Sequence, residues 1–339
     1  MSTKNLVSAV IILFFCLSSL IYKESEDQGY PQDPLQKLWV GNYVKEKDAL
    51  RASIKKLGAE EAYEIFKKDT ADKEFDVAHT LAHIMGELLY ESEGEKGITV
   101  CDGAFAFGCY HSFFGKAIAT EGLDSITRLA EACYKRWGLG LGCPHGIGHG
   151  ILGYFGDEKL VEALGVCDKL VWKEKFGGCQ SGVFMEYNFH TMQSVVSAEN
   201  RKFDPQRPYE PCTDIPTKNR ETCYFEQPQW WLRIFKNDFA RAADFCASIV
   251  GAKEKEACYL GTGNVAAPSS EYDVLKTQQS CAYIKEKAGE VSCLQRAAWA
   301  FFAELKARND SIKVCDKLSG KDIKECPSQK DISDRVNKL

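Results

Sequence analysis

The sequence lacks a large excess of basic side chains: 43 lysines and arginines stand against 48 aspartates and glutamates, so the net charge of the 339 residues is −5. It also lacks any long run of one charge sign. Because nucleic-acid binding depends on basic patches that neutralise phosphates, this balance predicts that nucleic acid is not a partner. Three enzyme signatures are missing as well: a Ser/His/Asp order, a phosphate-binding loop and a His-Glu-x-x-His motif. Motifs alone therefore assign no reaction.

A signal-peptidase site is missing after the one long apolar run. Leu6 to Tyr22 comprises 17 uncharged residues, which is short for a membrane span and long for a signal-peptide core. Since no Ala-x-Ala-like site follows, we favour an uncleaved membrane anchor in residues 1–24 over a signal peptide. Lipidation at Cys16 is disfavoured because bulky residues precede it. Both main interpretations place the bulk of the chain outside the cytosol (periplasmic, extracellular or lumenal), and it is secreted if the N-terminus is cleaved.

Cysteine, in contrast, is abundant, with 15 residues. Apart from Cys16, the cysteines fall into seven pairs, whose first members are 32, 34, 45, 34, 35 and 34 residues apart. A period near 34 is the length of one helical hairpin, so the spacing predicts an all-α fold, an α-solenoid of about seven hairpins. Pairing of neighbours is inferred from this period, although a sequence alone leaves other connectivities open. The pairs are Cys101 and Cys109, Cys133 and Cys143, Cys167 and Cys179, Cys212 and Cys223, Cys246 and Cys258, Cys281 and Cys293, and Cys315 and Cys326.

Each pair is expected to join the end of one hairpin to the start of the next and to contribute about 2–3 kcal/mol through the unfolded chain. Disulfides persist in the oxidising compartments to which the N-terminal segment would direct the chain. Four aspartates recur where the second helix of a hairpin would begin. Their side chains can accept hydrogen bonds from the free backbone N–H groups there. They are Asp124, Asp157, Asp238 and Asp310.

The repeat divides the rest of the chain into segments. Residues 23–40 are polar and are expected to form a tether, while apolar periodicity over 44–68 predicts two short helices with a break at Gly58. An inserted loop explains the single interval of 45 residues. The expected segments are 25–74 (tether and lead-in helices), 75–198 (histidine-bearing helical repeats), 199–211 (inserted loop) and 212–339 (C-terminal helical repeats).

Three units share a Cys-x-x-Gly motif, at 143–146, 179–182 and 258–261. Together with the unit of roughly 34 residues and its loop-closing cysteine pair, this layout resembles the cysteine-rich, Sel1-like helical repeat proteins, a branch of the tetratricopeptide-type solenoids. The resemblance covers most of residues 101–326. It implies an extracytoplasmic binding scaffold, whose protein or peptide partner would occupy the solenoid groove. It does not account for the histidines.

The stretch from Gly138 to Gly156 carries the clearest chemistry, because its Gly-Cys-x-His and His-x-x-x-His elements recur upstream. When the repeats are superposed on their second cysteines, His111 coincides with His145. The upstream pair, His79 and His83, then matches His145 and His149 if Val77 takes the place of the cysteine. Residues four apart share one helix face. The superposition therefore predicts a stripe of five histidines along consecutive first helices: His79, His83, His111, His145 and His149.

Imidazole nitrogen is the commonest protein ligand of zinc, copper and iron. We expect the stripe to bind one of these transition metal ions, or a haem through two axial histidines; no Cys-x-x-Cys-His occurs, which argues against covalent c-type attachment. Neighbouring helix axes are about 10 Å apart, so two His-x-x-x-His arms in a flat solenoid would be about 20 Å apart. Two separate sites, or pairing of each arm with His111, are the alternatives. His190 is out of register and is not expected to be a ligand. Candidate acid–base residues beside a metal are Asp76, Glu87, Glu186 and Tyr187.

Glycine is concentrated around His145 and His149. Gly146, three residues after a second cysteine, and Gly150 either let two helix backbones approach closely or lie against a bound cofactor. The histidines also have two interpretations. In the first, the chain binds a metal or haem, with enzyme activity as an extension, and the five histidines converge in one pocket. In the second, it is a non-catalytic scaffold, and they spread over a groove with no shared centre.

Overall fold

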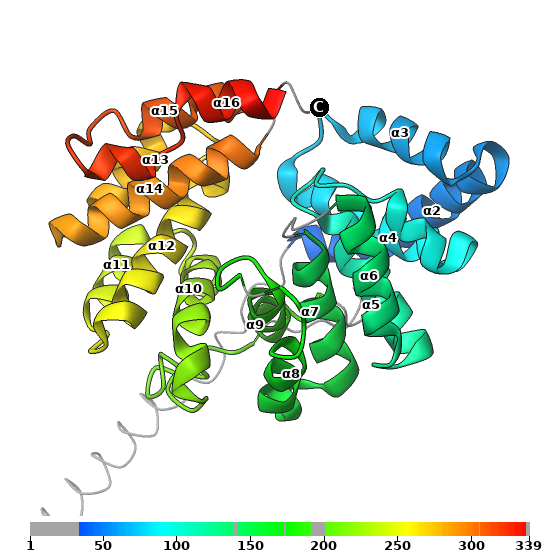
Figure 1. Cartoon of the computed structure of the whole chain (residues 1–339), viewed down its shortest axis with the longest axis horizontal. Helices are drawn as coiled ribbons and strands as arrows, with labels where there is room; N and C mark the ends of the chain where they lie inside the picture. The colour runs from blue at the N-terminus through cyan, green and yellow to red at the C-terminus, as the bar shows by residue number, and fades with distance from the viewer. Residues whose placement is uncertain (1–33, 138–141, 173, 192–200, 305, 337–339) are drawn as a thin grey trace, which may run out of the picture. The chain divides into compact units, whose positions relative to one another are not determined.

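The computed structural model describes residues 34–137, 142–172, 174–191, 201–304 and 306–336. All regular structure in these ranges is helical, which confirms the all-α class (Figure 1). In this part of the chain, no helix combines the length and the apolar composition that crossing a bilayer requires. The predicted anchor, Leu6 to Tyr22, lies outside the described residues.

The helices follow one another through short connections, several of which contain a 3₁₀ turn. The α-helices are α2 (Pro34–Leu57), α3 (Ala59–Thr70), α4 (Phe75–Glu93), α5 (Gly108–Glu121), α6 (Ser125–Trp137), α7 (Gly142–Phe155), α8 (Leu160–Cys167), α9 (Cys179–Phe189), α10 (Thr217–Ile234), α11 (Phe239–Ala247), α12 (Ala252–Ser269), α13 (Val274–Ala282), α14 (Lys287–Ala303), α15 (Ser311–Val314) and α16 (Gln329–Val336). The 3₁₀ turns are η1 (Gly94–Thr99), η2 (Asp157–Lys159), η3 (Arg308–Asp310) and η4 (Asp322–Glu325).

The chain divides into two compact units, residues 1–45 and residues 46–339, and the histidines and cysteine pairs belong to the second. Gly58 separates α2 from α3, as apolar periodicity predicted, because its φ of 87° is a conformation that residues other than glycine rarely adopt. The tether prediction needs correction, since α2 already begins at Pro34.

Seven helices of the second unit pack in chain order. Each of α4, α5, α7, α9, α10, α12 and α14 contacts the next one in this series. The helix that connects two members of the series packs on both of them: α6 contacts α5 and α7, and α13 contacts α12 and α14. Residues more than 30 positions apart thereby become neighbours across adjacent members of the series, as His149 on α7 and Glu186 on α9 do.

Seven disulfides join neighbouring cysteines, as their spacing predicted. The Cα–Cα distances lie between 5.5 and 6.6 Å, within the range that a disulfide requires. Four of them, such as Cys167–Cys179, link the end of a connecting helix to the first two turns of the next helix in the series. This density of disulfides indicates an oxidising compartment outside the cytosol.

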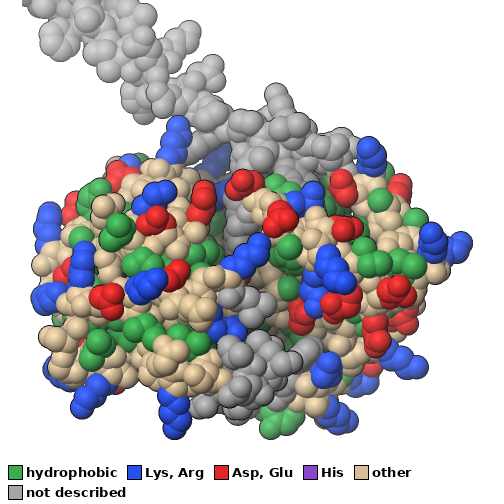
Figure 2. Space-filling view, turned by 90° about the horizontal axis from the view of Figure 1, so that it is seen from above, with side chains coloured by type: hydrophobic (Ala, Val, Ile, Leu, Met, Phe, Trp, Pro, Cys, Tyr) green, Lys and Arg blue, Asp and Glu red, His purple; other side chains and the backbone are tan. Residues whose placement is uncertain are grey.

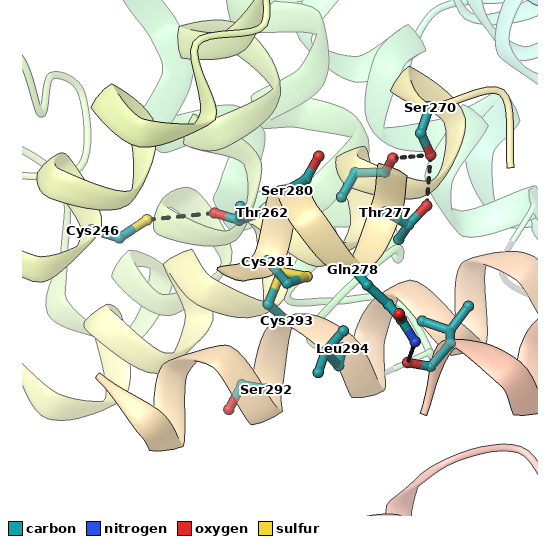
Figure 3. Close-up of a disulfide and its surroundings, with 12 residues drawn as sticks. Cys246, Thr262, Ser270, Thr277, Gln278, Ser280, Cys281, Ser292, Cys293 and Leu294 are labelled. Atoms are coloured by element: carbon teal, nitrogen blue, oxygen red, sulfur yellow. Dashed lines mark hydrogen bonds between the residues drawn. A yellow bond between two sulfur atoms is a disulfide. The ribbon is translucent and has the colours of Figure 1, made fainter. Parts of the chain in front are cut away.

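Buried polar groups near the Cys281–Cys293 disulfide find partners within the repeat (Figure 3). The Ser270 and Thr277 hydroxyls lie 2.6 Å apart and connect α12 to α13. The Gln278 amide donates to the carbonyl oxygens of Lys313 and Val314, at 3.0 and 3.2 Å, which ties α13 to α15. These buried polar groups thus satisfy one another's hydrogen bonds, as buried polar groups in folded proteins generally do.

Of the predicted aspartate caps, the one at Asp238 is observed. Asp238 accepts a hydrogen bond from the backbone N–H of Arg241 at 3.0 Å and so caps α11. Asp157 lies inside a 3₁₀ turn that precedes α8, so it is not at the N-cap of that helix. Asp310 is the N-cap residue of α15, but its side chain accepts no capping hydrogen bond. The sequence analysis missed Asp273, which caps α13 through the N–H of Lys276 at 2.9 Å.

The described part of the inserted loop, residues 201–211, contains no helix and packs on α10. The indole N–H of Trp230 donates to the Arg201 carbonyl oxygen at 3.2 Å, and that of Trp231 donates to the Pro208 carbonyl oxygen at 3.1 Å. The Arg201 guanidinium carbon lies 3.4 Å from the Trp230 ring centroid. On the face seen in Figure 2, acidic and basic side chains are interspersed among the residues that are coloured.

Candidate metal centre

Five histidines from three successive helices converge in the interior of the second unit. They are His79 and His83 on α4, His111 on α5, and His145 and His149 on α7. The His111 ring is in contact with all the others: its centroid lies 5.2 and 5.1 Å from those of His79 and His83, and 5.1 and 4.4 Å from those of His145 and His149. The predicted convergence therefore holds, and the central helix supplies the residue that joins the two arms.

Glycines bring these helices close enough for their imidazoles to meet. Three glycines lie directly against a backbone carbonyl group of the next helix in the series, and a Cβ atom on any of them would overlap the carbonyl oxygen. The contacts are those of Gly86 with Cys109, Gly148 with Cys179 and Gly263 with Cys293. Only glycine permits such an approach of two backbones. Helices that are spaced by side chains would not bring imidazoles of neighbouring helices into this contact.

The same contacts correct the predicted register of α4. Gly148 and Gly263 each lie five residues after the second cysteine of their repeat. Gly86 makes the equivalent contact, so the residue five positions before it, Leu81, takes the place of the cysteine in α4, and not Val77 as predicted. His83 is then equivalent to His111 and His145, two residues further on. His79 lies one helical turn before His83 on α4, and His149 lies one turn after His145 on α7.

A first group of ligand atoms comes from α4 and α5. His79 Nδ1 lies 2.7 Å from the Phe105 carbonyl oxygen and must donate to it, which leaves the lone pair on Nε2. His79 Nε2 lies 3.1 Å from His83 Nε2, and His83 Nε2 lies 3.1 Å from His111 Nδ1. Three ring nitrogens thus face one point.

An unusual backbone conformation places the carbonyl group that holds His79. The φ values of Phe105, Ala106 and Phe107 are 51°, 48° and 65°. They lie in the left-handed region, which residues other than glycine seldom adopt. Such conformations cost free energy and cluster at functional sites. Here the turn lies inside the loop that the Cys101–Cys109 disulfide closes.

A second group comes from α7, with support from α9. His145 Nε2 and His149 Nε2 lie 3.3 Å apart. His149 Nδ1 lies 3.0 Å from Glu186 Oε2, and the Thr191 hydroxyl donates to the same carboxylate oxygen. The carboxylate fixes the His149 tautomer with Nε2 turned toward His145. A carboxylate on the distal nitrogen is the usual support of a metal-ligating histidine, because it orients the ring and makes it more basic.

Burial sets the charge state of the cluster. Burial lowers the pKa of His83, His111 and His145 well below the usual range, and repulsion from the neighbouring imidazoles lowers it further. All three rings are therefore neutral at neutral pH, which is the form that binds metal ions. Among the described residues, His111 Nε2 and His145 Nδ1 are buried without a hydrogen-bond partner. Such orphaned polar atoms are rare in folded proteins, and binding of an ion is one way to satisfy them.

The histidine nitrogens lie close enough together to hold a metal ion. His79, His83 and His111 form one group of potential ligands and His111, His145 and His149 another, with the ligand atoms of each group within 4.8 Å of one another. Bonds of 2.0–2.1 Å to a tetrahedral zinc ion place the ligand nitrogens about 3.3 Å apart. Three pairs of imidazole nitrogens in the cluster lie at 3.1, 3.1 and 3.3 Å. The histidine groups could therefore hold a metal ion.

The remaining candidates take other positions. Glu87 forms ion pairs with Lys47 at 2.7 Å and Lys116 at 3.4 Å and belongs to neither histidine group. The Tyr187 ring lies against the Arg201 guanidinium, and burial raises the pKa of its phenol. His190 contacts Asp157 at 2.7 Å, outside the cluster as expected. The side chain of Asp76 lies outside the described residues.

Gly146 and Gly150 both lie against α5. A Cβ on Gly146 would approach the Tyr110 carbonyl oxygen and the Phe114 ring to 2.8 Å, and one on Gly150 would approach Ile118 to 2.7 Å. Neither Cα faces open space, so close helix packing accounts for both glycines.

Sequence reasoning missed two partners of the cluster, Phe105 and Thr191. A backbone carbonyl acceptor leaves no mark in the residue type, so Phe105 had no signal. Gly148 and Gly263 lie five residues after a second cysteine, but α4 has no cysteine, so the equivalence of Gly86 follows from its contact with Cys109 in the structure. Comparison of the chain with protein-family models, with curated proteins and with solved structures gives no match.

Proposed function

We propose that this protein binds transition metal ions through its five-histidine cluster, in an oxidising compartment outside the cytosol. The observation that carries the proposal is the convergence of ring nitrogens at 3.1–3.3 Å in a buried site whose end histidines are oriented by Phe105 and Glu186. A scaffold with incidental histidines would not need them to share a centre. Nor would it need Glu186, 1% exposed, to support His149, 0% exposed.

The cluster favours a metal ion over a haem. Axial ligands of a haem stand on opposite faces of a flat macrocycle, which must fit between them. The rings here contact one another instead, with centroids 4.4–5.2 Å apart. Imidazole nitrogens without thiolate or carboxylate in the first shell suit zinc, copper, iron or nickel.

A catalytic activity would depend on coordination number. Three histidines leave a tetrahedral ion one open position, which is the arrangement of catalytic zinc sites. Glu186 is committed to orienting His149, and Glu87 to its lysine partners, so neither is a strong candidate for acid–base catalysis. Enzyme activity is therefore an extension of the proposal that needs a substrate-accessible position on the bound ion.

We extend the proposal to the molecule around the site. The helical series stapled by disulfides supports a solenoid similar to the Sel1-like repeat proteins, and residues 1–24 would anchor it to a membrane or direct its secretion. A protein or peptide partner in the groove of such a solenoid is the alternative function. It would be favoured if the histidines bound no metal.

The first experiment measures metal content in the full chain, expressed in an oxidising compartment. Elemental analysis and titration with Zn²⁺ and Cu²⁺ would be run beside the double variant His145→Ala/His149→Ala. The wild type is expected to hold at least one equivalent, and the double variant to lose most of it. His190→Ala is the matched control, because His190 belongs to the same compact unit as the cluster but is not part of it. A folded wild type that takes up neither ion would overturn the proposal.

A further inference from the structure

His111 is the one histidine that belongs to both groups of potential ligands. It stands on α5, between the pair on α4 and the pair on α7, and its ring touches all four others. A single ion at one group would leave the other pair without a third ligand. Both groups can be complete at the same time only if they share this residue.

The two ring nitrogens of His111 have different surroundings. Nδ1 lies 3.1 Å from His83 Nε2 and so belongs to the first group. Nε2 is buried and has no hydrogen-bond partner among the described residues. The terminal histidines differ in this respect, since the second nitrogen of His79 is held by a carbonyl oxygen and that of His149 by a carboxylate. His145 also has an orphaned nitrogen, Nδ1, but its Nε2 is the atom that faces His149.

We propose that His111 bridges two metal ions, one held with His79 and His83 and the other with His145 and His149. This inference rests on the proposed metal-binding function. Nδ1 would ligate the first ion and Nε2 the second, so that each ion receives three imidazole nitrogens. A neutral imidazole carries one N–H proton. Binding of the second ion therefore releases that proton to solvent and leaves a shared imidazolate.

Charge supports the bridge. Two divalent ions in a buried site require negative charge nearby, because an uncompensated buried charge is costly. Glu186, on the far side of His149, is the carboxylate that contacts a histidine of the cluster in the described structure. An imidazolate at His111 adds a second negative charge at the point between the ions, where it interacts with both.

Copper(II) provides a direct test, since two copper(II) ions joined by an imidazolate are magnetically coupled. The full chain is titrated with Cu²⁺, and the doubly integrated electron paramagnetic resonance signal is compared with the copper content. The second equivalent is expected to lower the integrated signal per bound copper to less than half of its value at one equivalent. One proton per chain should be released with it. His190→Ala is expected to behave like the wild type.

Two variants separate a bridge from a merely structural role. His111→Asn keeps a polar side chain, and His111→Ala removes it; both are expected to abolish the signal loss and to bind the remaining copper as isolated ions. Near-ultraviolet circular dichroism checks that each variant is folded. A wild type that binds one equivalent, or two with full signal intensity, would overturn the bridge and leave the metal-binding proposal standing. A wild type that binds no metal would overturn both.

Discussion

The helices α4 to α9 and the helices α10 to α14 are built alike but carry different side chains at one equivalent position. Two residues after the second cysteine, the first block has His111, His145 and, on α9, Ser181, whereas the second block has Phe225, Leu260 and Gln295 and no histidine. Both blocks keep the disulfides and the glycine contacts. The repeat therefore forms without histidine at this position, so the histidines serve something other than assembly of the fold.

The largest expected effect on stability comes from substituting the glycines whose close backbone contacts occur in both blocks. Gly148→Ala and Gly263→Ala each place a methyl group on a backbone carbonyl oxygen, of Cys179 and Cys293 respectively. Since backbone cannot move aside as a flexible side chain can, we expect each variant to lower the unfolding free energy by about 3 kcal/mol. Only Gly148→Ala should also weaken metal binding, because it separates α7 from α9.

Chemical denaturation with the disulfides intact measures the stability of these variants. Gly165→Ala is the control, since a Cβ there meets no atom within 4 Å. This helical position should be stabilised by up to about 1 kcal/mol. Equal metal loss in Gly148→Ala and Gly263→Ala would show that the two blocks do not differ as described.

The next effect concerns a buried carboxyl group in the second block. Burial raises the pKa of Glu226 from 4.5 to about 7, while the Ser181 hydroxyl and the Arg296 charge act in the opposite direction. The folded state thus holds this proton more tightly than the unfolded state. The stabilisation is complete below about pH 4.5 and is lost as the pH rises to about 7, by about 3 kcal/mol.

Glu226→Gln tests this pH dependence, because an amide does not titrate. Relative to wild type, the variant should gain about 3 kcal/mol between pH 4.5 and pH 7.5, measured by denaturation at a series of pH values. Glu256→Gln, at an exposed position of α12, should show no such gain. A constant difference between Glu226→Gln and wild type over this range would contradict the expected titration.

The smallest effect sharpens the comparison between two buried glutamates. Glu186 contacts an imidazole and Glu226 does not. Loss of a carboxylate that supports a metal-ligating histidine typically weakens metal binding 10- to 100-fold. We expect Glu186→Gln to raise the zinc dissociation constant by this factor and Glu226→Gln to leave it unchanged, in competition titrations with a chelator. Similar constants for Glu186→Gln and wild type would remove Glu186 from the site.

The cysteine period was sufficient to predict the helical class and the seven neighbouring pairs, because a short disulfide loop at a fixed interval leaves few other arrangements. The break at Gly58 and the cap at Asp238 were also local enough to predict. The direct contact of the histidines was not, because an estimate of about 10 Å between helix axes ignores glycine. The predicted register of α4 was wrong for a related reason. This helix has no cysteine, so its alignment with the other repeats depends on the contact of Gly86 with the neighbouring helix.

Two histidines of the cluster lie two residues after a disulfide cysteine, His111 after Cys109 and His145 after Cys143. In a newly made, reduced chain these neighbours would be thiols, which prefer soft ions such as copper(I) and compete for zinc. Oxidation removes the sulfur ligands and closes the loop whose carbonyl group holds His79. If the cluster binds metal as proposed, disulfide formation would withdraw sulfur from coordination before the nitrogen site is assembled. A metal acquired earlier would be bound by a different set of atoms.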